Sequence, residues 1–294
     1  MGKVYEALKK AESDRTRAAV ALAAARANSA HPVADKARSD EFDFMDYSLS
    51  APPAADTKQA VQEEALETAA REAATQPARA LQVDVARIDP HLVAFYDCDP
   101  RASEQYNKLA ISLIAGTAER RLKRLMIASA QNGEGRTCVT LNLACALAHA
   151  KQKVLVVDTD LNRPSMLRLL GLESETGLAE AVANSLHAGP ASVTVQPYGF
   201  ALLPTRSRVE NPAELLASAH FREMLDAAAL EYDFILFDSS PLSMASDSNL
   251  LLRHTDATIL VIRAGKTSSI QMARAITPLT EDDIFGVVLN RAVQ

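Results

Sequence analysis

The sequence predicts an α/β fold in which a mostly parallel sheet is flanked by helices on both faces. From residue 88 onward, short apolar runs alternate with longer helical patterns. Most of the runs are continuous, as is typical of strands that are buried on both faces of a parallel sheet. The expected strands cover residues 125–128, 154–158, 200–204, 234–238, 257–262 and 286–289. Such sheets bind ligands beyond the carboxyl ends of their strands.

The composition indicates a globular protein from a reducing compartment. The chain has 294 residues, of which 48% are apolar, enough for one large domain or two small ones. Its formal net charge of −6 argues against binding to nucleic acid, which needs a basic surface. Cys98, Cys138 and Cys145 lack metal-ligand spacing, so we expect free thiols. No uncharged apolar run approaches the roughly 18 residues of a spanning helix, and we expect a cytoplasmic protein.

Three segments differ in composition along the chain. Residues 1–27 are expected to form a helix, because residues 3–27 contain no proline or glycine and are rich in Ala, Lys, Glu and Leu. This helix could dock on a partner or an anionic membrane surface, or simply be solvated. Residues 28–87 are acidic and rich in Ala and Pro, which predicts a largely disordered linker. Residues 88–294 are expected to form the nucleotide-binding domain.

A glycine-bearing loop between the first expected strand and a helical stretch predicts a phosphate site. Residues 129–137 read S-A-Q-N-G-E-G-R-T. Gly133 and Gly135 would let successive backbone N–H groups point at phosphate oxygens, and the following helix would present its positive end. Thr137 is the candidate magnesium ligand, whereas Arg136 stands where the P-loop pattern has lysine. The alternative is an ordinary strand-turn-helix connection, which uses glycine equally well.

Polar residues also follow other expected strands. Asp158 and Asp160 end the second strand, and Asp238 ends the fourth. A nucleoside triphosphate site needs a cation on the terminal phosphates, a hydroxyl and a carboxylate around magnesium, and a carboxylate to orient the attacking group. Each aspartate alone could be a helix cap. Asn290, after the last strand, could bond an adenine edge or only form a turn.

In this order, the motifs resemble those of the bacterial tyrosine kinases of capsule and exopolysaccharide synthesis, which are relatives of the MinD and ParA P-loop ATPases. The resemblance covers roughly residues 88–294. Residues 133–137 resemble the family's G-E-G-K-[ST] loop, residues 158–160 its second acidic motif, and residues 238–241 its D-x-x-P magnesium motif. Residues 1–12 are similar to the start of members found in exosortase-linked exopolysaccharide loci.

This resemblance implies ATP and Mg²⁺ as cofactors and phosphorylation of tyrosine as the activity. It also implies an inner-membrane polysaccharide co-polymerase, or chain-length determinant protein, as partner, which would hold this cytoplasmic protein at the membrane. The implied metal ligands are Thr137 and Asp238. The implied catalytic residues are Arg136, Asp158 and Asp160. The implied nucleotide-binding residues are Gly133, Glu134, Gly135, Arg136, Thr137, Cys138 and Asn290.

The sequence departs from the family pattern at several positions. Arg136 replaces the loop lysine and, being longer, planar and always protonated, need not reproduce its contact with phosphate. In the second acidic motif, Asn162 occupies the usual arginine position and Arg163 follows it. Asn107 and Ala110 replace two arginines of a helix that contacts a neighbouring subunit in the family, which leaves homo-oligomerisation open.

Three functions therefore stay open at this point. The first is a tyrosine kinase, although no tyrosine-rich tail follows Tyr232, the last tyrosine. The second is a catalytically degenerate nucleotide-binding regulator of polysaccharide synthesis and export, which the departures favour. The third is a MinD-like ATPase that works by nucleotide-gated dimerisation, although Gln131 occupies the position of that group's signature lysine.

Overall fold

The computed structural model describes residues 79–95, 99–243 and 246–291. The expected helix over residues 1–27, the linker up to residue 78, and Cys98 lie outside the described residues. The described chain forms an α/β fold, as the sequence predicts.

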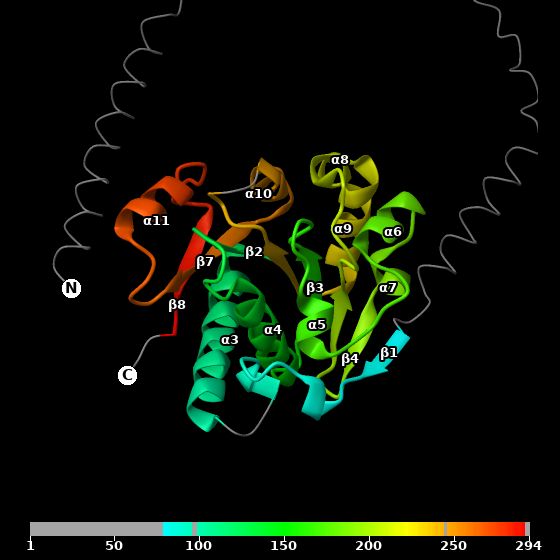
Figure 1. The fold of residues 1–294 in the computed structure, drawn as a ribbon, viewed down its shortest axis with the longest axis horizontal. Helices are drawn as coiled ribbons and strands as arrows, with labels where there is room; N and C mark the ends of the chain where they lie inside the picture. The colour runs from blue at the N-terminus through cyan, green and yellow to red at the C-terminus, as the bar shows by residue number, and fades with distance from the viewer. Residues whose placement is uncertain (1–78, 96–98, 244–245, 292–294) are drawn as a thin grey trace, which may run out of the picture. The chain divides into compact units, whose positions relative to one another are not determined.

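The described strands form one eight-stranded sheet in the order β1-β4-β5-β3-β6-β2-β7-β8 (Figure 1). All neighbouring pairs are parallel except β4 and β5, which are antiparallel. The strands are β1 (Arg79–Gln82), β2 (Arg124–Ser129), β3 (Val154–Thr159), β4 (Val193–Gln196), β5 (Phe200–Leu203), β6 (Phe234–Ser239), β7 (Ala257–Arg263) and β8 (Ile284–Asn290).

Helices connect most of these strands. The α-helices are α3 (Pro100–Arg120), α4 (Arg136–His149), α5 (Met166–Leu170), α6 (Leu178–Ala183), α7 (Ala188–Ala191), α8 (Pro212–Ala217), α9 (Ala219–Glu231), α10 (Ser246–Leu251) and α11 (Ser269–Ala275). Short 3₁₀ turns cover Val85–Arg87, Val93–Phe95 and Leu252–His254. The longest helix, α3, begins where Asp99 accepts a hydrogen bond from the Ala102 N–H and Pro100 supplies a preset φ.

Two apolar cores lie on opposite faces of the sheet, because successive side chains of a strand point to opposite sides. On β2, Leu125 and Ile127 belong to the core that includes residues of α3, α4 and α5. Met126 and Ala128 belong to the other core, which includes residues of α6 to α11. Figure 1 shows α3 and α4 side by side over the first of these faces. Burial on both faces explains why the central strands read as continuous apolar runs.

The six strands expected from the sequence are confirmed, with bounds that differ by one or two residues. Strands β1 and β4 were not predicted. β4 alternates buried and half-buried residues, and β1 is mostly exposed, so neither produces a continuous apolar run. β1 pairs with β4, and the sheet thus includes residues on the N-terminal side of the boundary expected at residue 88.

The buried helix α4 should be sensitive to loss of side-chain volume. Leu141 is fully buried in α4, whereas Leu230 on α9 is 87% exposed. We expect Leu141→Ala to lower the free energy of unfolding by about 2–5 kcal/mol, because it leaves a cavity. The matched variant Leu230→Ala should change it by less than about 0.5 kcal/mol. Urea denaturation followed by circular dichroism measures both, and equal losses would contradict the assignment of this core.

Candidate functional site

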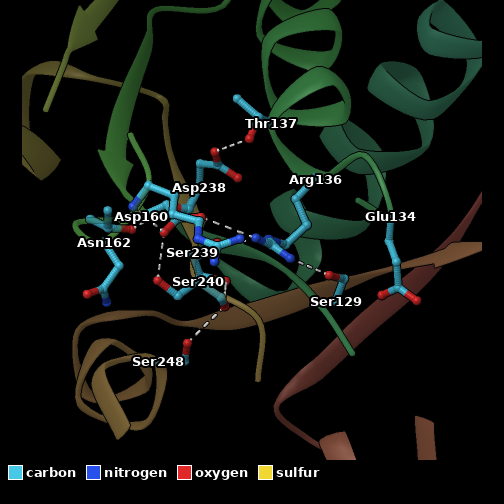
Figure 2. Close-up of polar contacts among 12 residues, drawn as sticks. Ser129, Glu134, Arg136, Thr137, Asp160, Asn162, Asp238, Ser239, Ser240 and Ser248 are labelled. Atoms are coloured by element: carbon cyan, nitrogen blue, oxygen red, sulfur yellow. Dashed lines mark hydrogen bonds and ion pairs between the residues drawn. The ribbon is translucent and has the colours of Figure 1, made fainter. Parts of the chain in front are cut away.

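The predicted polar residues lie together at the carboxyl ends of β2, β3 and β6. These three strands are neighbours, in the order β3-β6-β2. Asp158 on β3 and Asp238 on β6 are direct partners in the parallel register. The loop that follows β2 leads into α4, whose first residue is Arg136. The topology therefore brings the three predicted motifs to one edge of the sheet (Figure 2).

The loop requires glycine at Gly133 and Gly135. Both have positive φ, +77° and +95°, a conformation that side-chain-bearing residues rarely adopt. A Cβ atom on Gly135 would also lie 2.1 Å from Nδ2 of Asn290. That amide nitrogen donates a hydrogen bond to the Glu134 carbonyl at 2.8 Å. In this structure, Asn290 thus holds the loop. The contact with an adenine edge, expected from its position after the last strand, stays a prediction.

Glu134 also stabilises the loop from within. Its carboxylate accepts a hydrogen bond from the Gln131 N–H at 2.9 Å and another from the Thr267 hydroxyl. The side chain is buried and does not line the cavity described below. A nucleotide would therefore meet the backbone of this residue rather than its carboxylate.

Arg136 is buried and fully engaged with protein groups. Only 6% of it is exposed, although arginine is rarely buried unless paired. Its guanidinium donates to the Ser239 carbonyl (2.8 Å), the Ser129 hydroxyl (2.5 Å) and the Gln131 carbonyl (3.1 Å). It also forms an ion pair with Asp160 at 3.3 Å. Figure 2 shows this side chain directed toward the ends of β2 and β6.

Thr137 and Asp238 form the pair that would hold magnesium. The Thr137 hydroxyl donates to Oδ2 of Asp238 at 2.6 Å (Figure 2). The other carboxylate oxygen, Oδ1, is buried and has no hydrogen-bond partner among the described residues. An unpartnered buried oxygen beside a hydroxyl suits Mg²⁺, which typically takes one or two carboxylates and completes its shell with water and phosphate. In the described part of the chain, no group of three His, Cys, Asp or Glu residues could hold a metal alone.

The two facing carboxyl groups titrate far from their ordinary range. Burial raises the pKa of Asp238 to about 7, against the opposing effects of the Arg136 charge and the Thr137 hydrogen bond. Burial also raises the pKa of Asp158 well above its usual value, and the neighbouring Asp238 charge adds to this rise. Two carboxylates in so dry a place repel each other, so the pair holds a proton more readily than a free aspartate does.

Asp160 lies at the junction of the motifs. Besides Arg136, its carboxylate accepts hydrogen bonds from the Ser240 hydroxyl at 2.9 Å and the Arg163 N–H at 3.2 Å. Asp158, by contrast, faces Asp238 inside the sheet and accepts only long hydrogen bonds, at 3.3 Å and 3.5 Å, from backbone N–H groups. Of the two candidates for activating an attacking hydroxyl, only Asp160 lines the cavity.

A cavity of about 340 Å³ opens beside the loop and the start of α4. Six of the predicted site residues line it: Gly133, Gly135, Arg136, Thr137, Cys138 and Asp160. The other predicted site residues are not among the lining residues: Glu134, Asp158, Asp238 and Asn290. Cys138 is partly buried, and burial raises the pKa of its thiol to about 11, so it is a neutral thiol at physiological pH.

Sequence reasoning did not assign Ser165, Arg168 and Arg291 to the site, and it noted Arg163 only as a departure from the family pattern. All four line the cavity. Arg163 and Arg168 follow the acidic motif closely, three and eight residues after Asp160, and this proximity in sequence is a signal that could have found them. Nothing in the sequence indicated that residue 291, 123 positions further on, would reach the same cavity.

The two loop glycines differ in what a methyl group would meet. Gly133→Ala places a Cβ in open space. It should therefore lower the free energy of unfolding by only roughly 1–2 kcal/mol, the cost of a left-handed backbone conformation for a residue with a side chain. Gly135→Ala must also displace Asn290 and break its bond to Glu134, which we expect to add about 1 kcal/mol or more. Urea denaturation compares the two variants, and equal losses would argue against the contact between Asn290 and the loop.

The raised pKa of Asp238 predicts a pH dependence of stability. The unfolded chain releases the Asp238 proton near the ordinary pKa of 3.8, whereas the folded protein keeps it up to about pH 7. The stability that this group contributes is therefore fully present below about pH 4 and is lost progressively as the pH rises from about 4 to about 7. We expect the metal-free free energy of unfolding to fall across this range. Asp238→Asn should make the fall shallower, whereas the exposed control Glu210→Gln should not. An identical pH profile for wild type and Asp238→Asn would contradict the raised pKa.

No helix in the described part of the chain has the length and apolar character needed to cross a membrane.

The comparisons with known proteins agree with this geometry. A family model described as an AAA domain matches residues 122–277. The tyrosine-protein kinase YwqD of Bacillus subtilis is 30% identical over 69% of this chain and 87% of its own length. The putative tyrosine-protein kinase AmsA of Erwinia amylovora is 30% identical over 71% of this chain but only 29% of its own length. The relatives thus include proteins of similar length and much longer ones.

Solved kinase domains share the fold. The kinase domain of the Escherichia coli tyrosine kinase ETK is 29% identical, with a TM-score of 0.62 over 71% of this chain and 84% of that domain. The VpsO kinase domain is also 29% identical, with a TM-score of 0.57 over 65% of this chain and 98% of that domain. With the ordered motifs at one sheet edge and relatives that match over most of the folded part, this chain belongs to the bacterial tyrosine-kinase family.

Proposed function

We propose that this protein binds Mg-ATP at the loop after β2 and acts as a nucleotide-binding regulator of exopolysaccharide synthesis and export. The observation that carries the proposal is the Thr137–Asp238 pair, with one carboxylate oxygen left unpartnered, beside a glycine-turned loop and a cavity. A hydroxyl and a carboxylate in this arrangement are the protein's share of a magnesium-nucleotide site.

The phosphates would lie against the loop backbone and the start of α4. This helix has 14 residues, and its first turn supplies unpaired N–H groups and the positive end of the helix dipole. Thr137 and Asp238 would hold Mg²⁺, which neutralises charge on the phosphates when bound. The buried pair of Asp158 and Asp238 favours binding of a cation above about pH 7, where Asp238 is ionised.

The geometry around Arg136 favours the regulator over an efficient kinase. In the family that the chain resembles, a lysine at this position bridges the terminal phosphates. Here the guanidinium is bonded to Ser129, Gln131, Asp160 and Ser239. Asp160, the cavity-lining carboxylate that could accept a proton from an attacking hydroxyl, is engaged by the same arginine. Both parts would have to rearrange before they could act on a phosphoryl group.

Tyrosine phosphorylation is the second candidate function, because Asp158, Asp160 and Asp238 stand in the order and place that the family motifs imply. In that case Asp160 would accept the tyrosine proton while Thr137 and Asp238 held the metal.

The proposed partner is an inner-membrane polysaccharide co-polymerase, which would place this cytoplasmic protein at the membrane. This chain matches 29% of the length of AmsA, and we infer that the proposed partner corresponds to other segments of such a longer relative. The replacement of two family arginines in α3 by Asn107 and Ala110 does not support assembly into homo-oligomers through this helix. Ala110 is 1% exposed and belongs to the core, which leaves Asn107 as the only one of the two replaced positions at the surface.

Calorimetric titration with Mg-ATP tests the proposed function. We expect micromolar binding to the full chain and a loss of about tenfold or more in Thr137→Ala, because the variant lacks the metal-side hydroxyl. Thr277→Ala is the matched control. Thr277 is an exposed threonine that follows α11 and does not line the cavity. The absence of any binding by wild type would overturn the regulator and the kinase together.

A second arm separates the regulator from the enzymes. After incubation with Mg-ATP, we expect no phosphotyrosine by immunoblot and no release of inorganic phosphate. Phosphotyrosine that disappears in Asp238→Asn would establish the kinase instead, whereas phosphate release without phosphotyrosine would indicate an ATPase.

A further inference from the structure

The cavity beside the loop is lined by more positive charge than the sequence motifs account for. We propose that Arg163, Arg168 and Arg291, rather than Arg136, supply the cationic contacts to the phosphate tail of the nucleotide. This inference rests on the proposed function, since it names the residues that would take the place of the family's loop lysine. It joins Arg163, which directly follows the second acidic motif, to Arg168 and Arg291, which were not assigned to the site from the sequence.

Arg136 has little capacity left for a ligand. Its guanidinium can donate five hydrogen bonds. Four contacts to Ser129, Gln131, Asp160 and Ser239 are already present in the structure. Its charge is balanced by Asp160 in a buried pair. A phosphate that drew Arg136 away would leave buried acceptors and a buried carboxylate without their partner, which is strongly unfavourable.

The other three arginines are differently placed. All three line the cavity, are exposed, and form no ion pair with another residue in the described ranges. Arg163 lies between β3 and α5, Arg168 lies within α5, and Arg291 directly follows β8. Two segments separated by more than a hundred residues therefore bring guanidinium groups that form no ion pair within the described ranges to the same cavity.

The three arginines share the cavity with the first turn of α4. Thr137 and Cys138 on that turn line the same cavity as Arg163, Arg168 and Arg291. The guanidinium groups thus line the space beside the turn of helix where the phosphates would lie.

The charge balance of the cavity suits a polyphosphate. Asp160 is the only carboxylate among the residues that line it, and Arg136 already pairs with it. Three guanidinium groups remain without a counterion in the lining. Guanidinium binds phosphate oxygens in bidentate geometry, which a lysine ammonium cannot do. The three arginines thus offer the cationic contacts that Arg136, held by Asp160, does not offer.

Binding measurements on glutamine variants test this assignment. For Arg163→Gln, Arg168→Gln and Arg291→Gln in the full chain, we expect the Kd for Mg-ATP to rise by about tenfold each. The triple variant should lose on the order of a hundredfold or more, since the three contacts act on one ligand. Arg222→Gln is the matched control, because Arg222 is an exposed arginine of α9 that does not line the cavity. Circular dichroism confirms that each variant is folded.

Inorganic tripolyphosphate serves as a second probe and separates the two proposals. We expect it to bind wild type and to lose affinity in the triple variant. If wild type binds Mg-ATP and the triple variant binds it as tightly as Arg222→Gln does, the assignment of the arginines is overturned and the proposed function stands. If tripolyphosphate binds through the arginines but Mg-ATP does not bind at all, the proposed function fails while the anion site holds.

Discussion

The ion pair between Arg136 and Asp160, with the hydrogen bonds around it, is the interaction on which the site depends. One guanidinium joins the end of β2, the loop that follows it, the end of β3 and the end of β6. The ends of β2, β3 and β6 are distant from one another in sequence and lie side by side at this edge of the sheet. A buried pair of this kind is strongly destabilising to break, because the remaining partner would be left charged and unpaired. Arg136 therefore has a structural role at a position where the family has a phosphate contact.

The two facing aspartates add a second constraint. Asp158 and Asp238 lie on adjacent strands in direct register, where parallel pairing fixes their separation. Without a bound cation, the repulsion between the two carboxylates is reduced when the pair takes up a proton. In the proposed magnesium site, a metal ion would take the place of this proton. Without a metal ion, the raised pKa values of Asp158 and Asp238 keep the pair from carrying two full negative charges at neutral pH.

The central strands and the loop could be predicted from the sequence because both leave local signals. Continuous apolar runs mark β2, β3, β5, β6, β7 and β8, and glycines at 133 and 135 mark the turn before α4. β1 could not be predicted because it is an edge strand with mostly exposed side chains, which needs no apolar run. β4 lies inside the sheet, but its residues alternate between buried and half-buried, so it leaves no continuous apolar run either. Among site residues, Arg291 and the direction of Arg136 could not be predicted. Both depend on where distant strand ends meet, which no local pattern specifies.

The hydrogen-bond acceptors around Arg136 also determine what a lysine at position 136 would require. A lysine at this position would bring three donors on one nitrogen, whereas the present acceptors lie around a planar group with donors on three nitrogens. Arg136→Lys would thus leave the buried Ser129 hydroxyl or the buried Ser239 carbonyl without the donor that Arg136 supplies. A loop with lysine at this position would therefore need changes at these neighbouring positions as well as at residue 136.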